Sequence, residues 1–529
     1  MTSLGTPPAA AVATPTESAP VELIALHPGA RVSTAADGAT LLFLGPRGLA
    51  LGVLTPGVTA AVALLAAHPC VEDDLHQVVI AREGEAALLK LPTLLRRLRT
   101  GGWLSIRLEA AGRPLLTLRP LAPPAPRAAR GTAAVDRTRL RLSRFAVLRR
   151  DGEHTVLESP LAPVAADLLD PALAALLAGL PHRPAESPPG VGRALDLLAR
   201  HGLLVDPETE DADPDRAQWS PHELWFHGRT RAGRHDLPYG GTYWRAASAP
   251  PLPAVRPAFP GDAIDLPRPD PDAVRRADPT LTEALEGRRS IRAHDDAAPL
   301  TLDRLGEFLY RTARNRAIFH EERQEIGDRP YPSGGRCHEL ELYPLINNVE
   351  GIKPGLYHYD PQEHRLERVA EPGPAVHRLS EVARATSLMT APPQVVLVVS
   401  ARFGRVMWKY QTMGYALVLK HVGVLYQTMY LVATAMGLAA CGLGGGDSDM
   451  FALATGNRWE HEGSVGEFLL GTIGPEPHRV EPDHVEPDHI DPDHIDPDHI
   501  EPDRVEPSRV EPDHPERAGP TGGRDALSS

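Results

Sequence analysis

Two side chains with high pKa values stand next to each other in the stretch MWKYQ, where Lys409 precedes Tyr410. Unperturbed lysine and tyrosine both titrate near pH 10, so neither accepts a proton at pH 7 without help from its surroundings. A neighbouring ammonium lowers the pKa of a phenol, and burial lowers the pKa of a lysine. The pair is therefore a candidate for moving a proton, with Tyr410 as acceptor and Lys409 as polarising cation, or the reverse.

The place of this pair in the chain limits its local structure. It precedes Gly414 and the apolar run YALVLKHVGVLYQTMYLVATAMG, which predicts a buried helix of roughly 20 residues with Gly437 at its C-terminal cap. Adjacent residues do not share a helix face, so WKYQ must form a loop or a first turn if both side chains are to reach one substrate. The alternative is a surface lysine beside a core tyrosine.

Two further motifs have residue types that bind an anionic, flat ligand. RRSIR carries three guanidinium groups and a hydroxyl, and guanidinium forks hold phosphate in bidentate fashion. An exposed basic turn is an equally good interpretation of that motif alone. PSGG (332–335) allows backbone amides to approach a flat ligand closely, because glycine has no side chain. The residues concerned are Arg288, Arg289, Ser290 and Arg292, and Pro332, Ser333, Gly334 and Gly335.

Alternating and apolar segments around these motifs predict a sheet that positions them. CHELELYPLI predicts a strand, and GLYHYDPQEHRLERV predicts a hairpin turning at Asp360-Pro361. The short apolar run PPQVVLVVSA (392–401) suits the middle of a sheet, and SVGEFLLGTIG predicts another core strand. DPTLTEALEG predicts a helix that starts at Asp278-Pro279 and ends before RRSIR. The pattern predicts an α+β catalytic region.

The motifs occur in a specific order: RRSIR, PSGG, PGLYHYDPQEHRL, WKY, GVLYQTMYLVATAMGL, CGLGGGDSD and SVGEFLLG. Together they resemble the nitroreductase superfamily, and within it the SagB-type dehydrogenases, which oxidise thiazolines and oxazolines in ribosomally made peptides. The resemblance covers about 278–475, and extends more loosely to 138–245. It implies an FMN-binding α+β fold that dimerises, with the flavin at the subunit interface.

The resemblance also assigns roles to individual residues. Arg288, Arg289, Ser290 and Arg292 match contacts to the FMN phosphate and ribityl chain, and Pro332, Ser333, Gly334 and Gly335 match the loop against the flavin ring. Leu443 and Gly444 match backbone donors near the flavin N5, and Lys409 with Tyr410 match the pair associated with azoline oxidation. One departure concerns the C-terminal strand, where many nitroreductases have basic residues for the phosphate and GTIGPEPHR offers only Arg479.

Composition shifts divide the chain into six predicted segments. Residues 1–20 and the acidic pentad repeat of 479–529 have compositions typical of disorder. Segment 21–121 has helices followed by a hairpin and predicts a winged-helix-like unit; 132–245 predicts a second such unit with a connecting segment. A proline-rich linker, 246–275, leads to the catalytic domain, 276–478. The N-terminal units are candidates for recognising a peptide or partner; DNA binding by RRLR (96–99) is a weaker alternative.

Net charge and cysteine usage restrict the class of protein. The formal charge is −14, but thirteen acids and two arginines lie in 480–514, so the rest of the chain is nearly neutral and does not suggest nucleic-acid binding. Three scattered cysteines and the lack of a signal-peptide pattern fit a reducing cytoplasm. His222, His227 and His235 match no standard metal-ligand spacing, so no metal is predicted.

The sequence thus predicts an FMN-dependent azoline dehydrogenase that acts on a precursor peptide alongside cyclodehydratase partner proteins. Two alternatives stay open at this point. One is an NAD(P)H-dependent nitro or enone reductase, and the other is a flavin-free scaffold for partner enzymes.

Overall fold

The computed structural model describes residues 19–45, 47–121, 136–179 and 189–474. The acidic repeat, Arg479 and most of segment 1–20 therefore lie outside the described residues.

The first N-terminal unit combines three α-helices and a 3-10 helix with a three-stranded wing and a hairpin. Its strands are β1 Val21–Leu26, β2 Arg31–Thr34, β3 Thr40–Leu44, β4 Arg47–Gly52, β5 Leu104–Ala110 and β6 Arg113–Pro120, and its helices are α1 Pro56–Ala67, α2 Glu72–Glu83, η1 Glu85–Lys90 and α3 Leu91–Thr100. Sequence patterning located α1 and α3 but not α2, whose only buried side chains are Leu75 and Val79. In the basic patch, Arg99 pairs with Glu72 and Arg97 donates to the Ala50 carbonyl oxygen at 2.8 Å, so these two guanidinium groups serve the fold.

The second unit shares a sheet with the first. Its elements are β7 Arg141–Leu142, β8 Val147–Asp151, β9 His154–Glu158, β10 Val164–Leu168, α4 Pro171–Ala178, α5 Val191–Arg200, β11 Leu204–Val205, α6 Pro207–Asp211, α7 Pro214–Ala217 and α8 Pro221–Arg229. The six-stranded order is β1-β5-β6-β10-β9-β8, with β6 and β10 antiparallel at the junction. The two winged-helix-like units therefore form one continuous sheet, because β6 and β10 each gain a hydrogen-bonded neighbour from the other unit.

The catalytic region is built on a seven-stranded sheet with the order β13-β20-β19-β17-β21-β24-β23. These strands are β13 Ala263–Asp265, β17 Leu340–Ile346, β19 Gly355–Asp360, β20 Arg365–Ala370, β21 Val395–Arg402, β23 Leu438–Leu443 and β24 Glu462–Thr472. All eight residues of β21 are buried, which confirms its prediction as a central strand. The predicted hairpin at Asp360-Pro361 is also confirmed, as β19 pairs with β20.

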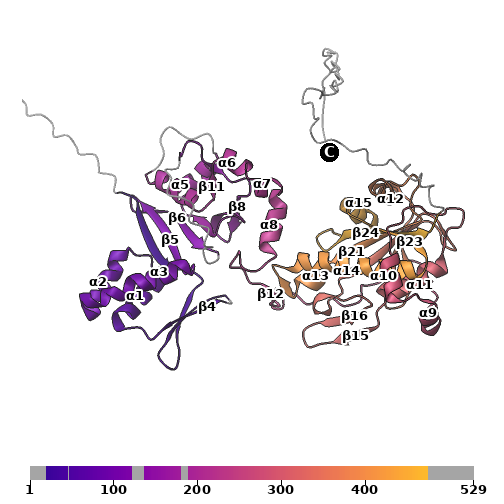
Figure 1. The fold of residues 1–529 in the computed structure, drawn as a ribbon, viewed down its shortest axis with the longest axis horizontal. Helices are drawn as coiled ribbons and strands as arrows, with labels where there is room; N and C mark the ends of the chain where they lie inside the picture. Colours follow the sequence, from indigo (N-terminus) through magenta and orange to yellow (C-terminus); the bar gives the residue numbers. More distant parts are fainter. Residues whose placement is uncertain (1–18, 46, 122–135, 180–188, 475–529) are drawn as a thin grey trace, which may run out of the picture. The chain divides into compact units, whose positions relative to one another are not determined.

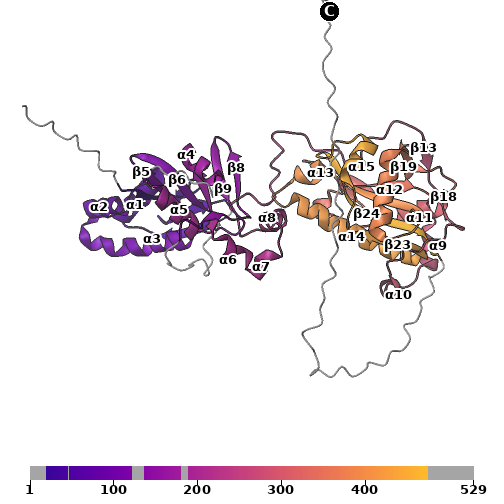
Figure 2. The same ribbon diagram turned by 90° about the horizontal axis from the view of Figure 1, so that it is seen from above.

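Helices cover both faces of this sheet (Figure 1, Figure 2). They are α9 Pro271–Ala277, α10 Leu281–Gly287, α11 Leu302–Ala313, α12 Pro374–Ser387, α13 Phe403–Met407, α14 Gly414–Ala435 and α15 Ser448–Thr455. Side chains of α11 and α14 pack with Leu397 and Val399 of β21, whereas α12 and α15 pack with Val396 and Val398. Short pairs β14 Leu300–Thr301 with β18 Val349–Glu350, and β15 Ala317–His320 with β16 Glu325–Asp328, complete the region.

Helix α14 is buried on one face only. By length and composition it could cross a membrane, and 33% of its most apolar window is buried. Val418, Leu425 and Met429 point into the core, but Tyr415, Leu419 and Val424 are 36–40% exposed. The sequence prediction of a buried helix therefore holds for the face on the sheet, whereas the exposed surface of the helix carries both apolar side chains and Lys420. Gly437 follows the helix with φ +61°, as the predicted cap requires.

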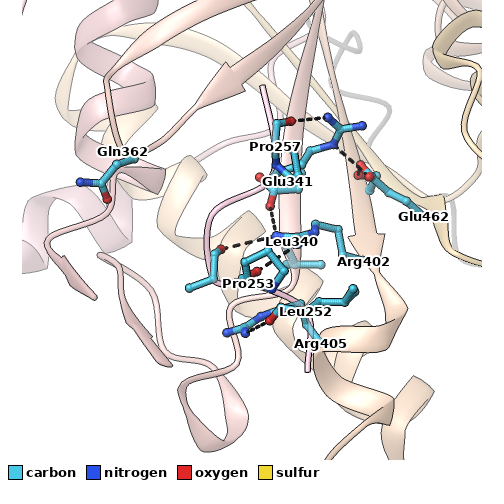
Figure 3. Close-up of polar contacts among 12 residues, drawn as sticks. Leu252, Pro253, Pro257, Leu340, Glu341, Gln362, Arg402, Arg405 and Glu462 are labelled. Atoms are coloured by element: carbon cyan, nitrogen blue, oxygen red, sulfur yellow. Dashed lines mark hydrogen bonds and ion pairs between the residues drawn. The ribbon is translucent and has the colours of Figure 1, made fainter. Parts of the chain in front are cut away.

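The proline-rich segment 246–275 is packed against the catalytic region rather than being a free linker. Figure 3 shows Arg402 and Arg405 reaching the backbone at Pro253 and Leu252, with donor–acceptor distances of 3.0 and 2.7 Å. Farther along, β13 adds an edge strand to the sheet by pairing with β20. Proline removes backbone donors but not carbonyl acceptors, so buried arginines can hold such a segment. This interaction was not visible in the composition of the segment.

Candidate functional site

Lys409 and Tyr410 meet the PSGG loop at one point. Lys409 lies in the loop between α13 and the two-residue strand β22 Tyr410–Gln411, as the helix-face geometry required. Gly335 has φ +60°, and a Cβ atom added there would lie 2.5 Å from Tyr410 Oη and 2.7 Å from Lys409 Nζ. Both polar ends therefore face the same glycine, and only a residue without a side chain fits between them.

Both members of the pair keep their protons in this environment. Burial lowers the pKa of Lys409, but a hydrogen bond with Tyr243 and the charges of Tyr410 and Cys337 outweigh it, and the net pKa is raised. Burial raises the pKa of Tyr410, and the opposing effect of the Lys409 ammonium is smaller. As predicted from the sequence, burial lowers the pKa of Lys409 and the ammonium lowers the pKa of Tyr410. In each residue the opposing effects are larger, so both pKa values are raised.

The turn that carries PSGG is strained and held from two sides. Gly335, Arg336 and His338 all have positive φ, at 60°, 55° and 44°. Such a conformation costs a non-glycine residue roughly 1–3 kcal/mol and persists only where surrounding contacts hold it. Arg405, buried in α13, donates to the Cys337 carbonyl oxygen at 2.7 Å.

A buried histidine of α14 holds the other side of this loop. His421 Nε2 accepts the Gly334 backbone N–H at 2.7 Å, so its Nδ1 carries the proton donated to Glu339 at 2.6 Å. His421 and Glu339 are 5% and 0% exposed. Sequence analysis assigned His421 no role; its position within an apolar run was the only signal, and that signal does not name a partner.

The RRSIR turn lies against the other end of α14. Tyr430 Oη accepts the Gly442 N–H at 2.7 Å and lies 2.9 Å from Ser290 Oγ, so one phenol joins this turn to the end of β23. The Arg288 guanidinium is 5.1 Å from the centroid of the Tyr430 ring. Arg289, Ser290 and Arg292 are exposed, as is Gly444, while the Leu443 side chain is buried.

A carboxyl group lies beside the glycine-rich loop that follows Leu443. Burial raises the pKa of Glu467 to about 7. A Cβ atom at Gly446 would overlap the Glu467 carboxyl group, whereas an added Cβ at Gly444 or Gly445 would meet no atom within 4 Å. Glu467 was missed from sequence because SVGEFLLG has the pattern of a core strand and gives no sign that this carboxyl faces the loop.

The predicted site residues thus form two clusters on one chain. We call Gly335, Lys409, Tyr410 and Tyr243 the Lys409 cluster. We call Arg288, Ser290, Tyr430 and Gly442 the Ser290 cluster. On α14, His421 bonds to the loop of the Lys409 cluster, and Tyr430 belongs to the Ser290 cluster. These two residues are nine positions apart, which is ~13 Å along the helix axis and about half a turn around it. The structure therefore places WKY beside PSGG, and RRSIR beside the loop that follows β23. Within one chain these two clusters are separated from each other.

Comparison with family models divides the chain into three consecutive matches. Residues 29–126 match the ThcOx helix turn helix domain, residues 140–236 match the cyanobactin oxidase ThcOx, and residues 285–459 match the nitroreductase family. Residues 285–459 thus form a nitroreductase-family domain. The two N-terminal matches precede it in an order that supports the resemblance to SagB-type dehydrogenases given by the motifs.

Curated proteins similar to this chain include three from different microbes. A nitroreductase of Methanocaldococcus jannaschii is 29% identical over 35% of this chain and 85% of its own length. The microcin B17-processing protein McbC of Escherichia coli is 34% identical over 21% of this chain, and the trifolitoxin-processing protein TfxB of Rhizobium leguminosarum bv. trifolii is 27% identical over 20%. The chain spans only 42% and 30% of the length of these two processing proteins.

Two solved structures show partial similarity to this chain. One from Ralstonia eutropha is 22% identical and matches over 45% of this chain and its whole length, with a TM-score of 0.32. A chain of the Escherichia coli microcin synthetase McbBCD complex is 22% identical over 37% of this chain and 74% of its own, with a TM-score of 0.31.

Proposed function

We propose that this protein is an FMN-dependent dehydrogenase that oxidises thiazolines or oxazolines in a ribosomally made peptide to thiazoles or oxazoles. The observation that carries the proposal is the convergence of Lys409 Nζ and Tyr410 Oη on Gly335. An azoline that gives up a hydride must also give up a proton, and these two groups are placed together where a proton could be accepted.

The residues present fit an FMN molecule. The loop at Gly444 and Gly445 is open, the Arg288 guanidinium lies against Tyr430, which bonds to the end of β23, and Arg292 is exposed two residues after Ser290. When bound, FMN supplies an acceptor for a hydride, which is one of the two hydrogens that an azoline ring loses. We assign Arg288, Arg289, Ser290 and Arg292 to its phosphate and ribityl chain, and Pro332, Ser333, Gly334, Gly335, Leu443 and Gly444 to its ring.

The second hydrogen leaves the azoline as a proton, which this chain's own residues must accept. Tyr410 is proposed as the acceptor, and the Lys409 ammonium stabilises the phenolate or polarises the ring nitrogen. The raised pKa of Lys409 supports the ammonium as its working form. Because the pKa of Tyr410 is also raised, we expect the rate to increase with pH as the phenol ionises, until Lys409 loses its proton.

We further propose that the functional unit is a homodimer with the flavin at the subunit interface. The Lys409 and Ser290 clusters are too far apart on one α14 to be neighbours, so a site that needs both is readily completed by a second copy. Exposed apolar side chains of this helix, such as Leu419 and Val424, offer surface for such contact.

The chemistry of the substrate also indicates the partners. An azoline forms when a cysteine, serine or threonine side chain closes on the preceding amide with loss of water, so a cyclodehydratase must supply this enzyme with its peptide. We assign recognition of the peptide or of that enzyme to the N-terminal region. Cys70, Cys337 and Cys441 are free and buried, which supports a cytoplasmic location.

Mass spectrometry tests the activity directly. The purified protein with FMN is incubated in air with an azoline-containing peptide and its cyclodehydratase. Loss of two hydrogens per ring is expected. A protein that retains FMN, leaves the rings unchanged and is bleached by NAD(P)H would be a reductase instead, and a protein that binds no FMN would be a scaffold.

A further inference from the structure

Residues 240–244, which precede the proline-rich segment, are hydrogen-bonded to the WKYQ loop. Strand β12 Gly240–Gly241 pairs with β22, so that Gly241 lies opposite Tyr410. The Tyr243 N–H donates to the Lys409 carbonyl oxygen at 3.0 Å, and Trp244 Nε1 donates to the Met407 carbonyl oxygen at 2.6 Å. These bonds join two segments more than 160 positions apart and place residues 240–244 beside Lys409.

Tyr243 adopts a backbone conformation that is rare for its residue type. Its φ is +54°, in the left-handed region, where a bulky side chain carries a cost. The ring is held edge-on to Trp408, with centroids 5.8 Å apart, and the Arg323 guanidinium lies 4.5 Å from its centroid. The surrounding contacts therefore maintain an orientation that the local backbone does not favour.

This orientation places the Tyr243 side chain next to Lys409, which therefore has two tyrosines beside it. Lys409 Nζ is 5.4 Å from the ring centroid of Tyr243 and 5.5 Å from that of Tyr410. The titratable groups that act on Lys409 are Tyr243, Tyr410 and Cys337, and burial keeps Cys337 a thiol by raising its pKa. Among these, Tyr243 is the group that does most to raise the pKa of Lys409.

We propose that Tyr243 is a positioning residue for catalysis, which holds the Lys409 ammonium against Gly335 and beside Tyr410. This inference rests on the proposed function for its kinetic consequence, but the link between Tyr243 and Lys409 is independent of the reaction. It makes the segment between the N-terminal region and the proline-rich stretch part of the active site. Neither the motifs nor the nitroreductase family match, which begins at residue 285, include it.

Two measurements on the full-length, FMN-loaded protein test the inference. The first is the pH dependence of Lys409 acetylation by acetic anhydride, followed by peptide mass spectrometry, because only the free amine reacts. Removing a hydrogen bond that raises the pKa of Lys409 must move the labelling midpoint to lower pH. Tyr243→Phe is the principal variant, and Tyr243→Gly is the second, because glycine adopts φ +54° without strain.

The second measurement is the pH profile of azoline oxidation. For Tyr243→Phe we expect kcat to fall about tenfold, the size expected for losing a hydrogen bond to a charged group, with little change in KM. The alkaline limb of the profile should move to lower pH, which loss of packing alone would not cause. Tyr239→Phe is the matched control, since its hydroxyl donates to the Thr230 carbonyl oxygen in the same segment.

The outcomes separate this inference from the proposed function. A wild-type protein that does not oxidise azolines overturns the function, yet the labelling experiment still tests whether Tyr243 acts on Lys409. Unchanged labelling midpoints in both Tyr243 variants, or an unchanged alkaline limb beside a normal kcat, would overturn the positioning role.

Discussion

The Lys409 cluster and the Ser290 cluster differ in how their side chains are supported. Lys409 and Tyr410 are partly buried, lie on a loop and face a strained turn that Arg405 and His421 hold in place. In the Ser290 cluster, by contrast, Ser290 is exposed, and Tyr430 connects it to Gly442 through one hydrogen bond to each residue. Burial and strain suit groups whose protonation matters, whereas exposed guanidinium groups suit an anion that arrives from solvent. The difference suggests that one cluster carries out chemistry and the other anchors a cofactor.

Removing the Lys409 side chain is the strongest test of whether the Lys409 cluster carries out chemistry. We expect Lys409→Ala to retain FMN but to lose azoline oxidation by about 10²- to 10⁴-fold, because a proton-transfer group contributes on that scale. Flavin content by absorbance and turnover by mass spectrometry measure the two effects separately. Lys353→Ala, at an exposed lysine of the same domain, is the control. Full turnover by the Lys409 variant would contradict a catalytic role for the cluster.

Subunit complementation tests whether one site draws on both clusters from different chains. Arg288→Ala is expected to lower FMN affinity, so this variant should be nearly inactive when FMN is limiting. The Lys409→Ala variant should be nearly inactive as well. In a mixture of the two variants after subunit exchange, half of the dimers are mixed and each mixed dimer has one intact site. About a quarter of the wild-type activity should therefore return.

The same mixture has a different result if both clusters serve a site within one chain. No activity would return, because each chain would carry one damaged cluster. Mixing Lys409→Ala with Tyr410→Phe is the matched control, since both changes lie in the same cluster and no intact site forms.

Replacing Gly335 tests how closely the Lys409 cluster is packed. The new Cβ atom of Gly335→Ala would overlap both Lys409 Nζ and Tyr410 Oη, so we expect kcat to fall at least tenfold. Gly38→Ala is a matched control, because Gly38 also has positive φ, at 83°, but has no atom within 4 Å of an added Cβ. The control should lose only about 1 kcal/mol of stability. Equal effects of the two changes would show that backbone strain, not contact with Lys409, matters at Gly335.

The smallest expected effect concerns Glu467, near the Ser290 cluster. Its raised pKa means that the folded protein binds a proton that the unfolded chain releases between about pH 4.5 and 7. The folded state therefore loses stability as pH rises through this window, by at most about 3 kcal/mol. Glu467→Gln should raise the melting temperature at pH 8 and leave it unchanged at pH 4. The exposed Glu460→Gln is the control; identical pH dependence in wild type and Glu467→Gln would refute the assignment.

Local sequence predicted the elements whose signal lies in their own residues. The central strand β21, the hairpin β19–β20 and helix α14 with its glycine cap follow from apolar runs, turn residues and helix-stop chemistry. Helix α2 was not predicted, because its sequence EDDLHQVVIARE shows little separation of apolar and polar faces. The packing of 246–275 was not predicted either, since its partners Arg402 and Arg405 lie about 150 positions away.

The sequence by itself determined the residue types of the candidate site and the loop on which Lys409 and Tyr410 lie, because motif order and helix-face geometry are properties of the chain. Only the tertiary structure decided which groups surround them. His421 reaches Gly334 across 87 positions, and Tyr243 reaches Lys409 across 166. Protonation also belongs to the tertiary level, since burial, Tyr243 and Cys337 act on the pKa of Lys409 besides its neighbour Tyr410, and the first three depend on how distant segments pack around it.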